Sequence, residues 1–477
     1  MPPVSVLPLE RYVVFFGAER MREVSVRLAE LRSRLAGRAV WNVSSTLAGG
    51  GVAEMVRSLL AYARGSGVDT RWVVIQGPQE FFHVTKRLHN AIHGSPGDGS
   101  PLDGDALRVY QSVADASCDE LCPMVRPNDV VIIHDPQPAA MIPRLLQCGA
   151  HVVWRCHIGG DVVNAETDQG WSFLEPFLRV ASAYVFSRAA YVPAQLDASR
   201  VTIITPSIDP FSAKNQPLGD ETVRAILVRA GIATGPVDAG LPLFTREDGT
   251  PGRVDRYAEV LRHGSPPTLD TPLVVQVSRW DRLKDPIGVM DGFVRIEAEA
   301  AHGARLLLVG PTASAAADDP EDGKVYGEVV KAWRTLPDEA RSRVDVVAVP
   351  TVDTDENAAI INAIQRHAAI IVQKSTHEGF GLTVSEAMWK ARPVIASAVG
   401  GIRDQVEDGV QGLLLRDPRD LDAFGAAVER LLGDPALAER MGQAGRARVL
   451  ERYLGIDALL RYGALIEKLD ARRAAAA

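Results

Sequence analysis

The sequence has no run of about 18 uninterrupted apolar residues, the length that a membrane-spanning helix needs. It also lacks a basic leader before the short apolar patch at 13–16, and no small-residue cleavage site follows that patch. Cysteines are few, and they match neither a C-x2-C metal pair nor a dense disulfide framework: Cys118, Cys122, Cys148 and Cys156. These absences predict a cytoplasmic protein with reduced thiols and no membrane partner.

An excess of basic residues is also absent. The 52 lysines and arginines face 60 aspartates and glutamates, which gives a formal net charge of -8. This balance offers no general attraction to nucleic acid, so no nucleic-acid partner is expected and any bound anion must be held by a local site. The sequence has no Walker loop, G-x-S-x-G or H-E-x-x-H motif either, so nothing in it supports hydrolase or protease chemistry.

The length of 477 residues exceeds what one hydrophobic core usually supports, which predicts two domains. Segments rich in Val, Ile and Leu alternate with helical patterns in both halves, as in parallel α/β sheets. The strands expected in the first half are 39–43, 71–75, 130–133, 151–156, 183–186 and 201–204. Those expected in the second half are 273–277, 305–309, 344–348, 370–373 and 393–396, with helices at 286–298 and 382–390 and, in the first half, at 52–64.

The predicted domain boundaries follow from this alternation. Residues 1–212 form a first doubly wound domain, 213–452 a second, and 453–477 a C-terminal helix and tail that is a candidate to pack back on the first. A segment rich in Gly, Pro and Asp at about 235–269 indicates an insertion or surface loop. Ligands bind at the carboxyl ends of strands in such sheets, so the chemistry is expected in a crevice there.

A glycine-rich segment, SSTLAGGGVAE at 44–54, lies between a predicted strand and a predicted helix. Its three consecutive glycines let the backbone approach a ligand, and the amides and the helix N-terminus favour an anion or hydroxyl groups. A tight turn explains the same glycines equally well. Gly50 and Gly51 are therefore candidates for binding a sugar.

Charged residues follow two predicted strands of the second half. Arg279 and Lys284 could hold a diphosphate jointly, although a solvated charged loop is the simpler interpretation of this pair alone. The stronger signal is STHEGFGLTVSE at 375–386, where Glu378 lies in a glycine loop and Glu386 in the early turns of a helix. Carboxylates accept hydrogen bonds from pairs of sugar hydroxyls, so this segment favours a hydroxyl-rich ligand.

Two further strand ends carry polar groups. His157 follows a strand and precedes two glycines, so it is a candidate to bind a sugar hydroxyl, and a core or surface histidine is an equal alternative. Asp135 is similarly placed after His134. The D-x-D spacings at 103–105 and 353–355 lie in polar, turn-like stretches where chance explains them. We expect no catalytic metal and no tightly bound cofactor.

Together these residues resemble the fourth family of retaining glycosyltransferases, whose mark is E-x7-E, here Glu378 and Glu386, with a basic pair, here Arg279 and Lys284. Within that family the chain is most similar to the trehalose glycosyltransferring synthases, over most of its length. The matching segments are 41–46, 49–54, 81–86, 89–90, 155–158, 206–210 and 378–383.

The resemblance implies a GT-B fold, in which two doubly wound Rossmann-like domains face each other across a cleft. It implies a retaining reaction that joins NDP-glucose and glucose into α,α-trehalose, with adenine, uracil and guanine all open as the donor base. It also suggests a homodimer. Three alternatives stay open: a retaining trehalose phosphorylase, a glucosyltransferase with another small acceptor, and a non-catalytic sugar-binding protein.

The resemblance also assigns roles to residues. Arg279, Lys284 and Glu378 are the catalytic candidates, with the first two on the donor diphosphate. Glu386 would bind the ribose. Glu378 and the residues after it would bind the transferred glucose, namely Gly379, Phe380, Gly381, Leu382 and Thr383. The acceptor side would be formed by Gly50, Gly51, Asp135 and His157.

Overall fold

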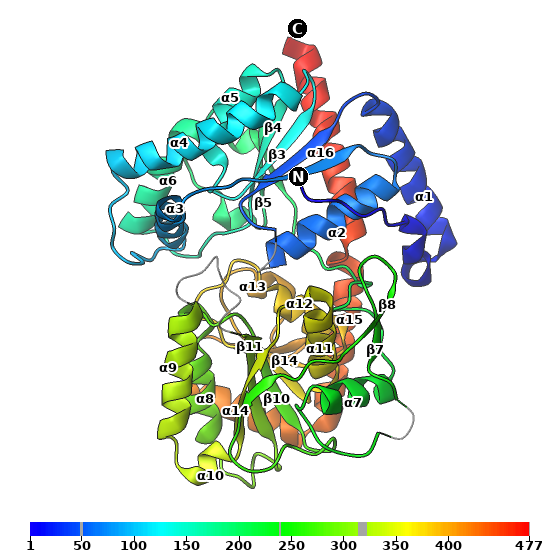
Figure 1. Ribbon diagram of the computed structural model, residues 1–477, viewed down its shortest axis with the longest axis vertical. Coiled ribbons are helices and arrows are strands. Elements are labelled where there is room, and N and C mark those ends of the chain that lie inside the picture. Colours follow the sequence, from blue (N-terminus) through cyan, green and yellow to red (C-terminus); the bar gives the residue numbers. More distant parts are fainter. Residues whose placement is uncertain (48–50, 238–239, 313–321, 477) are drawn as a thin grey trace. The chain divides into compact units, whose positions relative to one another are not determined.

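The computed structural model describes residues 1–47, 51–237, 240–312 and 322–476. The chain divides into two compact units, one made of residues 1–207 and 455–477 and the other of residues 208–454 (Figure 1). The boundaries expected from the sequence, after residues 212 and 452, stand a few residues from these divisions.

The first unit is built on a six-stranded parallel sheet with the order β2-β1-β3-β4-β5-β6. Its strands are β1 (Val40–Ser44), β2 (Thr70–Val74), β3 (Val130–His134), β4 (His151–Cys156), β5 (Ala183–Phe186) and β6 (Val201–Ile203). Its helices are α1 (Val13–Arg34), α2 (Gly51–Gly65), α3 (Gln79–Ile92), α4 (Gly104–Leu121), α5 (Ile142–Gln147), α6 (Ala165–Leu178) and α16 (Gly455–Ala476).

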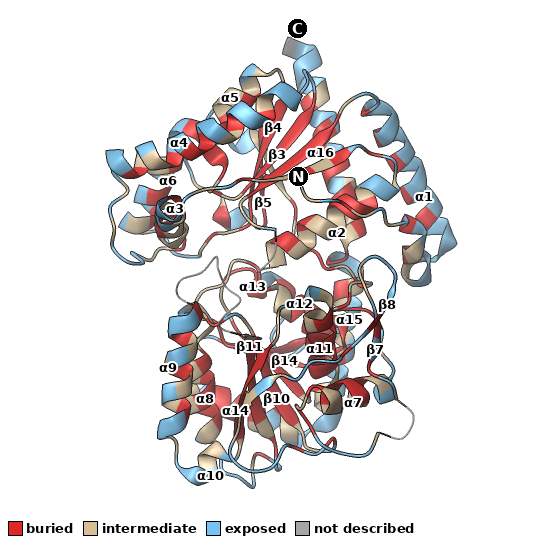
Figure 2. Cartoon of the chain, viewed as in Figure 1, coloured by how far each residue is buried: buried red, intermediate tan, exposed pale blue. Residues whose placement is uncertain are grey.

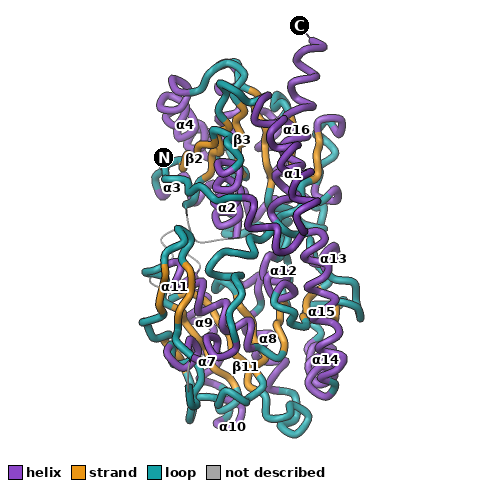
Figure 3. The backbone as a smooth tube through the Cα atoms, turned by 90° about the vertical axis from the view of Figure 1, so that its right-hand side faces the viewer, coloured by secondary structure: helices purple, strands orange, loops and turns teal. Residues whose placement is uncertain are grey.

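Strands β1, β3, β4 and β5 are buried at every residue, because helices cover both faces of a parallel sheet (Figure 2). The starts of β1 and β3 are joined through Asp129, which accepts hydrogen bonds from the Ala39 amide at 2.8 Å and the Trp41 indole at 2.9 Å. The C-terminal helix α16 contacts α1 and α2 and adds an ion pair between Arg20 and Asp457 at 3.4 Å (Figure 3).

The second unit holds a seven-stranded sheet with the order β15-β14-β13-β10-β11-β12-β9. Its strands are β9 (Glu259–Leu261), β10 (Leu273–Val277), β11 (Arg305–Pro311), β12 (Val344–Val349), β13 (Ile370–Gln373), β14 (Val394–Ser397) and β15 (Gly412–Leu415). Strands β7 (Leu243–Thr245) and β8 (Pro251–Arg253) form a separate hairpin. The helices are α7 (Asp220–Arg229), α8 (Pro286–Val294), α9 (Asp322–Thr335), α10 (Asp338–Arg341), α11 (Thr354–His367), α12 (Leu382–Trp389), α13 (Ile402–Gln405), α14 (Leu421–Gly433) and α15 (Pro435–Arg452).

The eleven strands expected from the sequence are all present, with ends that agree within two residues. The reading of 235–269 as an insertion or surface loop is wrong in part, because this segment carries β7, β8 and β9, and β9 completes the sheet by pairing antiparallel with β12. Arg262 fixes this edge by donating to the buried carboxylate of Asp345 at 2.8 Å. Each of these strands has three residues, too few for a repeating pattern to show. Within the described residues, no helix has the length and apolar character needed to cross a membrane.

Candidate functional site

In the second unit, the carboxyl ends of the neighbouring strands β10 and β13 bring two of the predicted residues into contact. Lys284 ends a short 3-10 helix after β10, and Glu378 lies in the loop after β13. The Lys284 Nζ is 2.6 Å from Glu378 Oε2. The two loops are tied by the Thr376 amide, which donates to the Leu283 carbonyl at 2.8 Å. The pair is therefore a fixed feature of this sheet edge.

The Glu378 carboxylate accepts hydrogen bonds from several side chains. Its Oε2 also accepts from the Gln373 side chain at 3.1 Å and from the Ser375 hydroxyl at 3.2 Å. The side chain is 10% exposed and that of Lys284 is 18% exposed. Charges in so sheltered a position interact more strongly than on an open surface. A ligand anion that binds Lys284 must therefore compete with this carboxylate.

A second buried ion pair supports the same edge. Lys374, which directly follows β13, is fully buried and pairs with Asp285. Asp285 has a left-handed backbone (φ 50°) and caps α8, because its Oδ1 accepts from the Gly288 amide at 3.1 Å. Lys374 is thus neutralised by a residue that also fixes the loop carrying Lys284.

The segment from Gly379 to Thr383 joins Glu378 to the start of α12. Gly381 adopts φ 85° as the residue before the helix, and a Cβ there would lie 3.1 Å from Ile402 and 3.2 Å from the Glu378 side chain. Phe380 is buried, with its ring centroid 5.7 Å from that of Tyr453. The glycine therefore sets the entry to α12, and the loop that carries Glu378 leads directly into this helix.

Glu386 lies further along α12 and is 3% exposed. Its Oε1 is 2.9 Å from the Lys214 Nζ, and its Oε2 accepts from the Gln365 amide at 3.4 Å. Burial alone would raise the pKa of Glu386, but Lys214 and Lys390 outweigh it and hold the pKa below its ordinary value. The residue is an ionised, paired carboxylate at neutral pH.

Arg279 is placed differently from Lys284. Its side chain is 46% exposed and lies 3.8 Å from Asp281, on the loop that follows β10. Next to it, Trp280 is buried, and its amide donates to Asp322 at 3.0 Å. The anchored tryptophan fixes the start of this loop, and Arg279 lies at its surface.

In the first unit, three buried side chains form a chain of hydrogen bonds: one from the middle of β1, one from the end of β3 and one from directly after β4. The Asn42 Oδ1 lies 2.9 Å from His134 Nε2, and His134 Nδ1 lies 3.0 Å from His157 Nε2. Burial lowers the pKa of His134 to about 3 and that of His157 well below its ordinary value, so both rings are neutral.

The chain fixes the protons of both rings. An amide oxygen can only accept, so His134 carries its proton on Nε2 and accepts at Nδ1. His157 must then donate from Nε2, which leaves its Nδ1 as an acceptor. That Nδ1 is buried and has no hydrogen-bond partner in the described part of the chain. His157 thus offers one unsatisfied acceptor, the complement of a hydroxyl donor.

Asp135 and Arg155 adjoin the histidines. The Asp135 Oδ1 accepts from the His157 amide at 2.7 Å, and burial raises the pKa of Asp135 to about 7. Arg155 is 1% exposed, and its Nε and Nη1 have no partner among the described residues. Unsatisfied buried groups of both kinds, donors and an acceptor, collect at this strand end. Gly51 begins α2, whereas Gly50 lies outside the described residues.

The two D-x-D segments serve local structure. Asp103 caps α4 by accepting from the amides of residues 105 and 106. Asp353 caps α11 and pairs with Arg246 at 2.7 Å. Across the described ranges, no group of three or more His, Cys, Asp or Glu side chains is arranged to hold a metal ion.

Comparison with known proteins shows which family the chain belongs to. The model of the trehalose synthase N-terminal domain matches residues 42–193, and that of glycosyl transferases group 1 matches residues 259–448. A trehalose synthase of Pyrococcus horikoshii is 34% identical over 97% of this chain and 96% of its own. The chain belongs to the trehalose synthase family.

The chain is also similar to more distant proteins. A trehalose phosphorylase of Pleurotus pulmonarius is 26% identical over 92% of this chain, which spans 58% of that protein. The solved sucrose-phosphate synthase of Thermosynechococcus elongatus superposes with a TM-score of 0.62 at 21% identity, covering 91% of this chain and 100% of the other. The solved structure confirms the expected GT-B fold.

Several residues of this candidate site were missed by the sequence analysis. Lys374 and Gln373 lie at the end of the same strand that leads to Glu378, so strand-end position was an available signal for them. Lys214 and Arg155 carried no such signal. Lys214 is far from Glu386 in the sequence, and only the folded chain brings the two into contact. Arg155 lies inside a predicted strand, and its position there did not indicate a binding role.

Proposed function

We propose that this member of the trehalose synthase family transfers glucose from NDP-glucose to free glucose, and so forms α,α-trehalose with retention of configuration. The observation that carries the proposal is the contact between Lys284 and Glu378 beside the N-terminus of α12. A cation, a carboxylate and the N-terminus of a helix, close together in the fold, suit a ligand that carries both phosphate and sugar hydroxyls.

On the donor side, Lys284 and Arg279 bind the diphosphate. The phosphate oxygens replace Glu378 as the partner of Lys284, and the released carboxylate accepts hydrogen bonds from the glucosyl hydroxyls. The amides from Gly379 to Thr383 add donors at the helix N-terminus. Glu386 binds the ribose hydroxyls, which share the carboxylate with Lys214.

In the reaction, the bond between the glucosyl C1 and the leaving phosphate oxygen breaks, and a bond forms from C1 to the hydroxyl oxygen of the acceptor on the same face. The leaving phosphate takes the acceptor proton, so an enzymic nucleophile is not needed. Lys284 and Arg279 stabilise the negative charge that grows on the phosphate, an effect that is commonly the largest in catalysis.

On the acceptor side, Asp135, His157 and the loop at Gly50 and Gly51 bind glucose. The unsatisfied Nδ1 of His157 accepts from a sugar hydroxyl. The proposal includes catalysis without a metal ion or a tightly bound cofactor, by a cytoplasmic homodimer.

The test is incubation of the purified protein with glucose and, separately, ADP-, UDP- and GDP-glucose, with EDTA present, followed by assay of trehalose and free NDP. Trehalose in proportion to NDP supports the proposal and identifies the donor base. No product with any of the three donors rejects it. Trehalose formed from maltose alone would also reject it, in favour of an isomerase.

The phosphorylase is the second candidate, because the family relationship to trehalose phosphorylases covers 92% of this chain. Incubation of the protein with trehalose and inorganic phosphate, without nucleotide, separates the two reactions. Release of glucose and glucose 1-phosphate would assign the phosphorylase. The small share of the phosphorylase that the chain spans, 58%, favours the synthase.

A further inference from the structure

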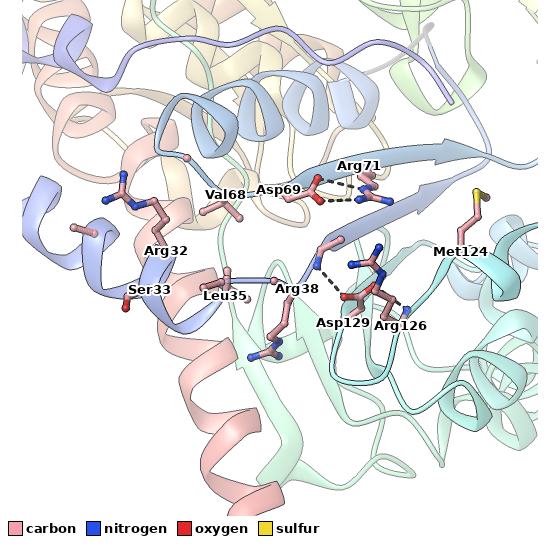
Figure 4. A pocket seen from close by; sticks show the side chains of 15 residues that line it. Arg32, Ser33, Leu35, Arg38, Val68, Asp69, Arg71, Met124, Arg126 and Asp129 are labelled. Carbon is pink, nitrogen blue, oxygen red and sulfur yellow. Dashed lines mark hydrogen bonds and ion pairs between the residues drawn. The ribbon is translucent and has the colours of Figure 1, made fainter.

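The first unit has a pocket of about 410 Å³ at the amino-terminal ends of β1 and β2. The arginines labelled in its wall point to different sides (Figure 4). Asp69 holds Arg71 through hydrogen bonds of 3.2 and 2.8 Å, and Asp129 binds the start of β1. The labelled groups therefore do not converge on one ligand. An ion pair of the second unit, between Lys214 and Glu386, has a clearer link to the proposed reaction.

Lys214 lies in the segment before α7, and hydrogen bonds fix the backbone on both sides of it. Asn362 of α11 donates to the Ala213 carbonyl at 3.0 Å. The Trp389 indole of α12 donates to the Asn215 carbonyl, also at 3.0 Å. The lysine is therefore placed by the same two helices that form the surroundings of Glu386.

The lysine meets the carboxylate in a sheltered position. The Lys214 Nζ is 2.9 Å from Glu386 Oε1, and the two side chains are 22% and 3% exposed. Glu386 Oε2 accepts from Gln365 at 3.4 Å. Lys390 is a further cation nearby, and its Nζ donates to the Asn215 side chain at 2.9 Å and to the main-chain carbonyl of Glu386 at 3.3 Å. Lys214 and Gln365 therefore hold one carboxylate oxygen each.

The charge of Lys214 also decides the form in which Glu386 is present. Burial raises the pKa of Glu386, and the charge of Lys214, followed by that of Lys390, reverses this effect. An ionised carboxylate accepts hydrogen bonds at both oxygens, which suits the adjacent 2′ and 3′ hydroxyls of a ribose, whereas a protonated one carries a donor. Without Lys214 the buried carboxylate would lose its direct counter-charge, and protonation would become easier.

We propose that Lys214 is a positioning residue for the nucleotide, which acts through Glu386 by holding this carboxylate ionised and in place for the ribose hydroxyls. The inference rests on the proposed function, namely on a nucleotide whose ribose lies at Glu386. Because a 2′-deoxyribose lacks one of the two hydroxyls, the protein should prefer a ribonucleotide, and this preference should depend on Lys214.

The test is isothermal titration of the full chain at pH 7 with ADP, UDP and GDP, and with the 2′-deoxy form of each nucleotide that binds. We expect the wild type to bind the ribonucleotide about tenfold more tightly than the 2′-deoxy form, because a charged acceptor loses a hydroxyl partner. Lys214→Met should weaken ribonucleotide binding by about tenfold and remove most of this preference. Lys331→Met, at an exposed lysine of α9, should change neither quantity.

The pH dependence separates this role from a merely structural one. In Lys214→Met, ribonucleotide binding should strengthen from pH 7 to pH 9, because the rise in pH ionises Glu386 when the lysine is absent and Lys390 remains. The wild type and Lys214→Arg, which keeps the cation, should show no such gain. Glu386→Gln should bind weakly at both pH values, and adding Lys214→Met to it should have little further effect.

A thermal melt checks that each variant is folded, and Lys214→Gln takes the place of Lys214→Met if the methionine variant does not fold. Unchanged nucleotide binding in the uncharged variant overturns the inference and leaves the proposed reaction standing. Equal wild-type affinity for the ribonucleotide and its 2′-deoxy form does the same. No binding of any of the three nucleotides by the wild type overturns both.

Discussion

Lys284 offers the most direct residue-scale test of the proposed reaction. Lys284→Ala removes the cation that contacts Glu378 at 2.6 Å, and with it the charge that stabilises the leaving phosphate. We expect kcat to fall by about 100-fold or more, the usual cost of a lost electrostatic contact in a transition state. Steady-state kinetics with NDP-glucose measures this. Lys331→Ala, at an exposed lysine of α9, serves as the control, and full turnover in Lys284→Ala would contradict the assignment.

Asp135 predicts a pH dependence of stability. Its pKa is about 7 in the folded chain against an ordinary value of 3.8, so burial favours its protonated form. Its contribution to the free energy of unfolding is full below pH 3.8 and is lost as the pH rises towards 7, by at most about 4 kcal/mol. Asp135→Asn removes the titration and suits the left-handed backbone at this position (φ 64°).

The variant should therefore gain stability relative to the wild type at pH 8 and less at pH 5. Guanidinium denaturation at the two pH values measures the difference. An Asp135→Asn chain with the same pH dependence as the wild type would show that the carboxylate is ionised in the folded state. Loss of trehalose formation in this stabilised variant would place Asp135 among the groups that bind substrate.

The histidine chain predicts the protonation of individual ring nitrogens. We expect 15N NMR of histidine-labelled protein to show His157 protonated on Nε2 and bare on Nδ1, since Asn42 Oδ1 can only accept. Asn42→Asp keeps an acceptor and should preserve this tautomer. His134→Phe removes the partner of Nε2 and should allow the other tautomer to appear. A wild-type spectrum with the proton on His157 Nδ1 would mean that the hydrogen bonds run in the opposite direction. It would contradict the role of His157 Nδ1 as an acceptor for a sugar hydroxyl.

At the scale of elements, the start of α12 depends on one backbone conformation. Gly381→Ala places a Cβ at φ 85°, with contacts of 3.1 Å to Ile402 and 3.2 Å to Glu378. We expect a loss of about 1 to 2 kcal/mol in stability and a larger fractional loss of activity, because the strain displaces the carboxylate. Gly323→Ala, in α9 with open space around the new methyl group, should be neutral or stabilising in the same melts.

The elements also show how far the sequence alone could go. Apolar runs such as those of β3 and β11 indicate buried parallel strands, and the glycine-bearing segment before α12 was placed correctly between a strand and a helix. The three-residue strand β9 was taken for loop, because its place in the sheet is set by pairing with β12 and not by its own pattern. In the same way, Lys284 and Glu378 were predicted one by one, but their contact depends on β10 and β13 being neighbours.

At the scale of the whole molecule, two units with separate cores carry the two groups of candidate residues. The Lys284, Glu378 and Glu386 set lies in residues 208–454, and the Asp135 and His157 set lies in the other unit. Because each set is assembled by its own sheet, the proposed function assigns the nucleotide to one unit alone. Each group of residues should then respond to its own ligand.

Hydrogen exchange followed by mass spectrometry tests this division. NDP, in the base identified by the donor screen, should slow exchange in 279–285 and 376–390, because it orders the loop after β10 and the start of α12. The strands β3 and β4 should exchange as in the free protein. Lys284→Ala should abolish much of the protection and Lys331→Ala none of it. Protection that centres on β3 and β4 would instead place the nucleotide in the first unit, and would contradict the roles given to Lys284 and Glu386.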